Sequence, residues 1–163
     1  MHARSRQTGL FAVVVLGLVV VLAGSTFAQS SNTSVGTWKL NIAKSTFAAG
    51  TIPQSGGFTI AEAGADIKVT VDWVAANGTV THYGFTVRYD GKDYPITGNP
   101  SRDGVAMTRV DANTLKIDYK KGGKVVSAQT AVVSSDGKVC TIAAVNTDAQ
   151  GKTVKSVAVY DKK

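Results

Sequence analysis

The sequence predicts an all-β domain, a single up-and-down antiparallel β-barrel of about ten strands preceded by a signal peptide. Three observations predict this fold. Runs rich in Val, Thr, Ile and Tyr alternate with turn pairs such as Asn77-Gly78 and Asp136-Gly137. Within the runs, apolar and polar residues alternate with a period of two, which is typical of half-buried strands. No segment after the N-terminal apolar run has a long apolar pattern of helical period.

Residues 1–28 have the three parts of a secretory signal peptide. A basic start without acidic residues precedes an uninterrupted apolar run over 10–24, and the small residues Thr26 and Ala28 fit a cleavage site. The run is short for a membrane span. We expect a mature domain of residues 29–163 that is exported to the periplasm or the extracellular space, with no stable membrane insertion after cleavage. An uncleaved N-terminal anchor is the alternative, and it also exports the domain.

The mature chain divides into short strands in regular order. Within the third, for example, Val69 and Val71 face one side and Thr70 the other. A short helix is expected over about 41–49, with Asn41 as its N-cap. The ten expected strands cover residues 35–40, 57–63, 66–74, 79–90, 93–98, 104–110, 114–120, 124–134, 138–147 and 152–160.

The short turns favour pairing between strands that are neighbours in sequence. An open sheet of ten strands would leave two long unpaired edges, and closure into a barrel removes them. A two-sheet β-sandwich uses the same strand signals and is the alternative. The regular hairpin spacing favours the barrel, because Greek-key sandwiches need some long crossovers.

Composition excludes several function classes. The chain has a net charge of +7, but no arginine cluster or interleaving of aromatic and basic residues, so we expect no nucleic-acid partner. One Cys excludes an intramolecular disulfide framework, and one Cys with two His cannot form a cysteine-rich zinc site. We expect no metal and no cofactor. His82 and Cys140 have no catalytic partner visible in the sequence, and we expect no catalytic residue.

The mature N-terminus carries Gly36-Thr37-Trp38 in the stretch VGTWKL. This resembles the G-x-W first strand of the calycins, the superfamily of lipocalins and fatty-acid-binding proteins. The resemblance implies that Gly36 and Trp38 close the base of the barrel and do not contact ligand. With GTWKLN and the segment YDGKDYPITGNP over 89–100, the chain is also similar to small bacterial secreted proteins with a lipocalin-like domain.

Near its C-terminus the chain differs from the fatty-acid-binding branch of the calycins. That branch places an R-x-Y there, whose arginine and tyrosine hold a carboxylate. Here the matching stretch is Ala158-Val159-Tyr160, so the tyrosine is present and the arginine is replaced by alanine. A carboxylate loses its bidentate partner at that position. The link 41–56 holds at most one short helix, so the resemblance implies a more open portal.

Candidate ligand-binding residues come from the least regular segment and from the aromatic strands. Arginines are the best partners for an anionic or polar ligand, and tyrosines can donate a hydroxyl. An ordinary corner with surface arginines, and aromatic residues packed in a core, are the alternative. The candidates are Arg88, Tyr94, Arg102, Arg109, Tyr119 and Tyr160.

These observations favour an exported protein that binds or carries a small hydrophobic or amphipathic molecule. The first alternative is a non-catalytic structural or interaction protein of the bacterial envelope, with a filled core. The second is an enzyme on a calycin barrel, which requires His82 or a Tyr/Arg pair inside the lumen. The sequence does not specify the ligand.

Overall fold

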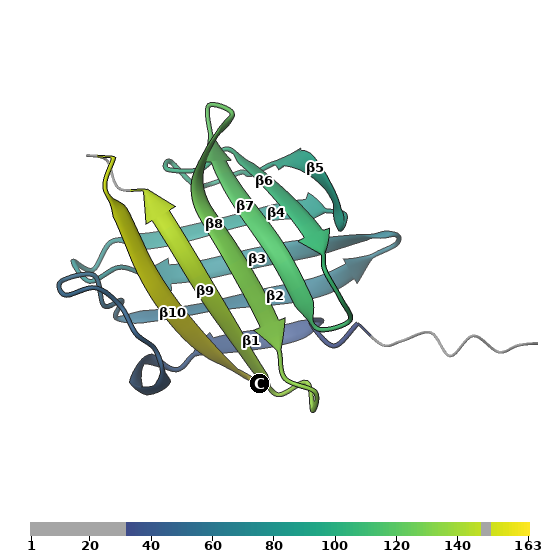
Figure 1. Ribbon diagram of the computed structural model, residues 1–163, viewed down its shortest axis with the longest axis horizontal. Coiled ribbons are helices and arrows are strands. Elements are labelled where there is room, and N and C mark those ends of the chain that lie inside the picture. The colour runs from purple at the N-terminus through teal and green to yellow at the C-terminus, as the bar shows by residue number, and fades with distance from the viewer. Residues whose placement is uncertain (1–31, 148–150) are drawn as a thin grey trace, which may run out of the picture. The chain divides into compact units, whose positions relative to one another are not determined.

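The described part of the chain folds into ten β-strands and one three-residue helical turn, joined by turns and short links (Figure 1). The computed structural model describes residues 32–147 and 151–163, and the predicted leader lies outside them. The all-β prediction is confirmed, with every strand end within three residues of expectation. The strands are β1 (Gly36–Leu40), β2 (Ser55–Ala63), β3 (Asp66–Val74), β4 (Val80–Val87), β5 (Asp90–Pro95), β6 (Gly104–Arg109), β7 (Thr114–Lys121), β8 (Lys124–Val133), β9 (Val139–Thr147) and β10 (Thr153–Lys162).

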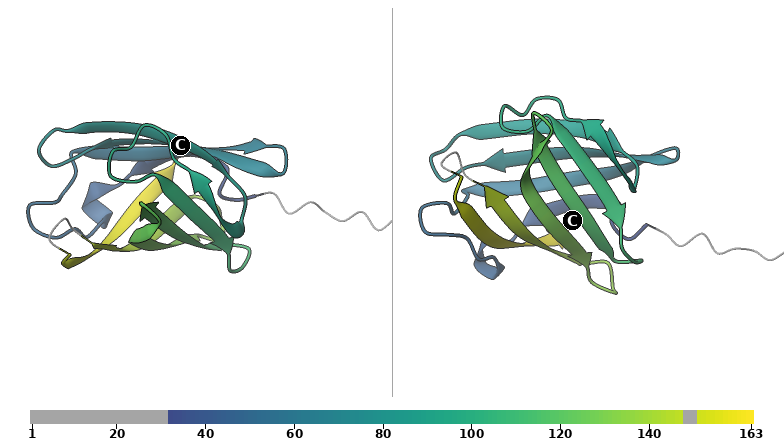
Figure 2. Two further views of the ribbon diagram at one scale, coloured as in Figure 1. Left: turned by 90° about the horizontal axis from the view of Figure 1, so that it is seen from above. Right: turned by 45° about the horizontal axis from the view of Figure 1, so that its top comes forward.

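The strands form one antiparallel sheet that curls into a nearly closed up-and-down barrel (Figures 1 and 2). Their order is β4-β3-β2-β1-β10-β9-β8-β7-β6-β5, so all neighbours in sequence pair except β4 and β5, which are the two edges of the sheet. The first and last strands also pair, with Trp38 opposite Lys162 and Leu40 opposite Tyr160. The predicted barrel is confirmed, and the sandwich alternative is not observed.

The barrel is least tightly joined between β4 and β5. There the two edges meet through one isolated bridge, in which Gly84 and Thr97 exchange both backbone hydrogen bonds at 3.2 Å. Thr97 lies in the link that follows β5, and Gly98 after it has a φ of 83°. A Cβ at Gly98 would lie 2.8 Å from the carbonyl oxygen of His82, so glycine is required for this close approach.

The period-two patterns point their apolar residues into the barrel. Val69 on β3 and Phe85 on β4 are buried, whereas Lys68 between two inward residues is exposed. Leu115 and Ile117 on β7 follow the same rule. Inward-facing residues of all strands therefore share one interior, because strand side chains alternate between faces.

The link between β1 and β2 contains a shorter helix than the sequence predicts. It is a 3-10 turn over Ile42–Lys44, and Asn41 caps it by accepting a hydrogen bond from the Lys44 amide at 3.2 Å. Thr46 then pairs with Val157 of β10, which holds the chain extended and ends the turn. In the described ranges no helix has the length and apolar character to cross a bilayer.

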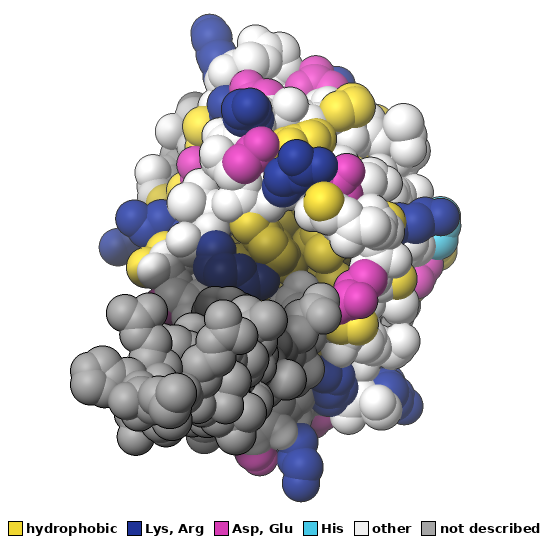
Figure 3. All heavy atoms as spheres, turned by 90° about the vertical axis from the view of Figure 1, so that its right-hand side faces the viewer, with side chains coloured by type: hydrophobic (Ala, Val, Ile, Leu, Met, Phe, Trp, Pro, Cys, Tyr) yellow, Lys and Arg dark blue, Asp and Glu magenta, His cyan; other side chains and the backbone are white. Residues whose placement is uncertain are grey.

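The outer surface carries charges of both signs. Lys120 pairs with Asp93 at 2.6 Å, and Lys44 pairs with Asp161 at 3.3 Å. On the side shown in Figure 3, lysine, arginine and acidic side chains are interspersed, and hydrophobic side chains are visible in a hollow between them. Such exposed pairs contribute little to stability, so the interior holds the fold together.

Candidate functional site

The barrel interior contains a cavity of about 520 Å³. This volume lies within the range of about 300–1,000 Å³ typical of small-molecule sites. Residues from opposite sides of the barrel line it, including Val71 of β3 and Ile142 of β9. The cavity reaches the barrel end at which Thr51, Thr147 and the segment 99–102 lie, and we call this end the mouth.

The deep part of the cavity is aromatic and aliphatic. Trp38 is 1% exposed, and its ring stacks on Phe58 with centroids 6.0 Å apart. Phe58 in turn meets Tyr160 edge to face at 4.9 Å. Ile60, Val133 and Cys140 complete this apolar wall. Aromatic pairs at these spacings add attraction beyond the burial of their surface.

Trp38 is held at this end by polar contacts on its far side. Its indole N–H donates to the carbonyl oxygen of Ser34 at 2.9 Å, and the Lys162 ammonium lies 5.1 Å from the ring centroid. Gly36 has a φ of 133°, and a Cβ there would lie 2.6 Å from Cε of Lys162. Trp38 also lines the cavity, so the expectation that it does not face the ligand space is wrong, because its inward ring reaches the interior. Gly36 is not among the lining residues, and the closure role of both residues stays a prediction.

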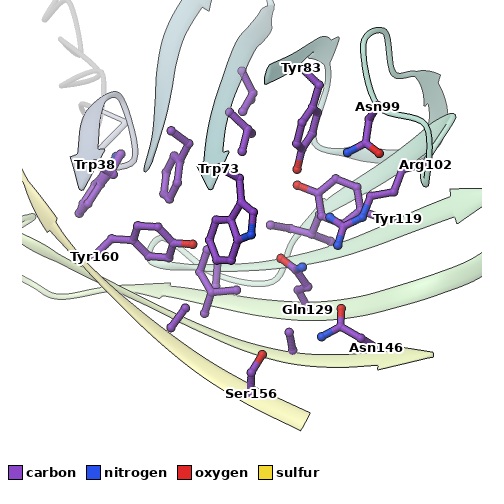
Figure 4. A pocket seen from close by; sticks show the side chains of 18 of the residues that line it. Trp38, Trp73, Tyr83, Asn99, Arg102, Tyr119, Gln129, Asn146, Ser156 and Tyr160 are labelled. Atoms are coloured by element: carbon purple, nitrogen blue, oxygen red, sulfur yellow. The ribbon is translucent and has the colours of Figure 1, made fainter. Parts of the chain in front are cut away.

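Polar side chains gather in the other part of the cavity (Figure 4). In Figure 4 the tyrosine rings of Tyr83 and Tyr119 point their hydroxyls toward one another, and Arg102 lies beside Tyr119. The cavity thus has an apolar end and a polar end. Further polar residues of the lining are Asn99, Gln129, Asn146 and Ser156.

Arg102 and Tyr119 form the electrostatic centre of the polar part. The Arg102 guanidinium carbon lies 4.2 Å from the centroid of the Tyr119 ring, within the range of a cation–π interaction. Burial raises the pKa of the Tyr119 hydroxyl well above its ordinary value, and the neighbouring Tyr83 adds to the rise, while the Arg102 charge opposes it. The hydroxyl therefore stays protonated and can donate a hydrogen bond.

Burial also keeps two deeper groups neutral. It raises the pKa of the Cys140 thiol from 9.0 to about 12, and it raises the pKa of the Tyr160 hydroxyl. A thiol with so high a pKa is a weak nucleophile at neutral pH. Cys140 therefore acts as a small apolar wall residue of the cavity.

These raised pKa values predict a loss of stability in alkali. A group whose pKa is higher in the folded state stabilises the fold fully below its unfolded pKa, and this contribution is lost as the pH rises toward the folded pKa. For Cys140 the loss begins near 9.0 and continues to about 12. Each such group adds at most about 1.4 kcal/mol per pH unit to the fall in unfolding free energy. Urea unfolding at several pH values should show a shallower fall for Cys140→Ala; an unchanged slope would contradict the burial of the thiol.

Three of the six candidate binding residues line the cavity: Arg102, Tyr119 and Tyr160. The other three lie elsewhere. Arg88 follows the inward Val87 and points outward, where its Nε donates to Asp66 at 2.7 Å. The Tyr94 hydroxyl donates to Asp90 at 3.1 Å, and Tyr94 is not among the lining residues.

Arg109 lies at the barrel end opposite the mouth. Its guanidinium donates to the side chain of Asn32 at 3.3 Å and to the Ala112 carbonyl oxygen at 3.2 Å, and it covers the Tyr89 ring at 4.3 Å. The Tyr89 hydroxyl is hydrogen-bonded to Ser34 at 3.2 Å. These contacts tie Arg109 to the N-terminal segment that covers the base of the barrel.

His82 lies on the outer face of β4. Its Nδ1 is 2.6 Å from a carboxylate oxygen of Asp72, which stands directly opposite it on β3, and both side chains are largely exposed. The pairing explains why no partner is visible in the local sequence. No group of three or more His, Cys, Asp or Glu side chains that could hold a metal ion occurs in residues 32–147 and 151–163.

Sequence reasoning missed several polar residues of the lining. Gln129 and Asn146 lie on β8 and β9, whose two faces both hold small residues, so the period-two pattern does not tell the inner face from the outer one there. Ser156 lies on β10. Strand register supplies the missing signal: Gln129 pairs with the buried Ala144, and Ser156 pairs with it from the other side.

Comparison with known proteins identifies the fold. No protein-family model and no curated protein matches the chain. Among solved structures, zebrafish ileal bile acid-binding protein complexed with cholic acid matches with a TM-score of 0.51 and 18% identity, over 80% of this chain and 99% of that one. The chain has the calycin barrel fold.

A second solved structure supports the same architecture. It is a protein designated EF1p2_mFAP2b, bound to DFHBI, which matches with a TM-score of 0.53 and 12% identity over 82% of this chain and 97% of that one. At such identities the likeness shows the fold alone. The similarity to small bacterial secreted proteins stays a prediction.

Proposed function

We propose that this calycin-fold chain is an exported protein that binds and carries a small hydrophobic or amphipathic molecule inside its barrel. The observation that carries the proposal is the cavity of about 520 Å³, with aromatic walls at one end and a few convergent polar groups at the other. Sites of this composition bind small molecules, because the apolar walls supply affinity and the polar groups fix orientation. The two solved structures described above are complexes with small molecules.

The two alternatives account for less of the structure. A structural module with a filled core does not explain an interior cavity of this size. An enzyme requires a reactive group in the lumen, and the Tyr119 and Arg102 pair is there. The raised pKa of Tyr119 makes it a hydrogen-bond donor rather than a base, which suits ligand binding.

Binding is tested by titrating the purified protein with N-phenyl-1-naphthylamine, a neutral dye that fluoresces in apolar surroundings. We expect saturable binding at a single site, because the dye transfers its apolar surface from water into an apolar cavity. The emission of the bound dye should shift to the blue, because its surroundings are then apolar. Octanol or a similar competitor should displace the dye. Absence of saturable binding to the folded protein would overturn the proposal.

Export is a separate part of the proposal and has its own test. The basic start, apolar run and small residues of 1–28 support cleavage after Ala28. Expression of the full chain in a Gram-negative host should place the protein in the periplasmic fraction, with an N-terminus at Gln29. Recovery of the uncleaved chain in the cytoplasm would contradict export.

A further inference from the structure

Arg102 is the one charged residue among the described residues that line the cavity. Within residues 32–147 and 151–163 its guanidinium has neither a carboxylate partner nor a hydrogen bond, and it lies over the Tyr119 ring. The other two arginines of the described chain differ in this respect. Arg88 is paired with Asp66, and Arg109 is hydrogen-bonded to Asn32.

The backbone that carries Arg102 is fixed at both ends. The link from β5 to β6 is closed by a hydrogen bond from the Ile96 amide to the Asp103 carbonyl oxygen at 3.0 Å. The Asp103 carboxylate accepts from the Gly122 amide at 3.0 Å, which ties the link to the β7–β8 turn. The bridge between Thr97 and Gly84 joins it to β4. Arg102 is therefore held at the mouth by its neighbours in the link.

The contact with Tyr119 uses none of the hydrogen-bond donors of Arg102. The guanidinium carbon lies 4.2 Å from the ring centroid, and the guanidinium carries five N–H donors. This cation–π contact also restrains the side chain before any ligand arrives, so less conformational freedom is lost on binding. A carboxylate matches these donors, because its two oxygens can accept two parallel hydrogen bonds.

We infer that the cavity takes an anionic amphiphile whose carboxylate is held by Arg102 at the mouth, while its apolar tail extends to the Trp38 end. This inference rests on the proposed binding function and adds the ligand class and its orientation. One positive charge and no negative charge line the described cavity, so an anion is favoured over a neutral or cationic ligand. At the deep end Tyr160 has Ala158, not an arginine, two residues before it, so no cationic side chain of the described residues lines the cavity there. The Lys162 ammonium at this end lies against the Trp38 ring and donates to the Thr33 carbonyl oxygen, and Lys162 is not among the lining residues.

The affinity test compares dodecanoic acid with 1-dodecanol, each displacing N-phenyl-1-naphthylamine near neutral pH. We expect the acid to bind about tenfold or more tightly than the alcohol, because charge-assisted hydrogen bonds exceed neutral ones. Arg102→Gln should remove this difference, because both ligands then meet a neutral amide in place of the guanidinium. Lys68→Gln is the matched control: it removes one positive charge from the exposed outer face of β3 and should preserve the preference.

The orientation test uses bromine, which quenches tryptophan on contact. In a Trp73→Phe background Trp38 is the one remaining tryptophan. With the carboxylate at the mouth, 12-bromododecanoic acid should quench Trp38 strongly and 2-bromododecanoic acid weakly. The opposite order would place the carboxylate at the deep end and overturn the inference.

The outcomes separate this inference from the proposed function. If neither dye, acid nor alcohol binds, the binding function itself fails. If dye, acid and alcohol bind but the acid has no advantage, the function stands and the role of Arg102 is wrong. The comparison of acid with alcohol on the unmodified protein decides this even if Arg102→Gln does not fold.

Discussion

Replacing Trp38 by alanine is expected to lower the free energy of unfolding by about 3–5 kcal/mol, which is the usual cost of truncating a buried tryptophan. The side chain is 1% exposed and stacks on Phe58. Its removal also leaves the Ser34 carbonyl oxygen without the indole donor at 2.9 Å and removes the ring beneath the Lys162 ammonium. Chemical denaturation followed by circular dichroism measures the change.

Trp73→Ala is the matched control for this prediction. Trp73 also lines the cavity, but it is only half-buried. Its ring meets that of Phe47 in the β1–β2 link edge to face, with centroids 6.4 Å apart. We expect a smaller loss of stability, about 1–2 kcal/mol, together with weaker dye binding. Equal losses for the two variants would show that Trp38 does not hold the base of the barrel.

The second large effect is on binding. Ala144→Trp should weaken dye binding about 100-fold, because Ala144 faces the cavity and an indole there would occupy part of it. If the ring displaces about 100 Å² of dye contact, at about 25 cal/mol per Å², the loss is close to 2.5 kcal/mol. The fold should remain, since the ring enters space that is already empty.

Ala143→Trp provides the matched control for the cavity variant. Ala143 is the preceding residue of β9, and it is exposed on the outer face because neighbouring strand residues point to opposite sides. Its dye affinity should stay within about twofold of the unmodified protein. Equal weakening by both variants, or by neither, would contradict an interior binding site.

Much of the barrel could be predicted from the sequence because its signals are local. The period-two pattern of β3 and the turn pair Asn77-Gly78 specify a strand, a turn and the register of the next strand together. The same register places Asp72 opposite His82, and so this pair follows from the turn.

The candidate site was only partly predictable, as the three arginines illustrate. Arg88 directly follows the inward Val87, so the alternation of side chains along a strand predicts that Arg88 points outward. Arg109 lies two residues after the buried Met107, so the alternation along β6 places both side chains on the inner face. Arg109 is the last residue of β6, however, and its side chain contacts Asn32 at the base of the barrel. Arg102 lies in the irregular link between β5 and β6, where side chains do not alternate between two faces. Its place at the mouth therefore depends on tertiary contacts.

The cavity itself could not be predicted from the pattern. Inward alternation gives the same sequence signal whether the interior is filled or hollow. The small inward residues Ala131, Ala144 and Ala158 leave the space that larger residues would fill. Recognising Ala131 and Ala144 as inward requires the register of β8 and β9, because both faces of these strands hold small residues.

Locating a bound molecule tests the central claim most directly. We would measure intermolecular NOEs between bound N-phenyl-1-naphthylamine and the methyl groups of the protein. An interior site predicts NOEs to Val71, Ile117 and Ile142, which line the cavity, and none to Val132 or Val145, which are exposed on the outer face. NOEs confined to the outer valines, with none to the lining methyls, would contradict a hollow ligand-binding barrel.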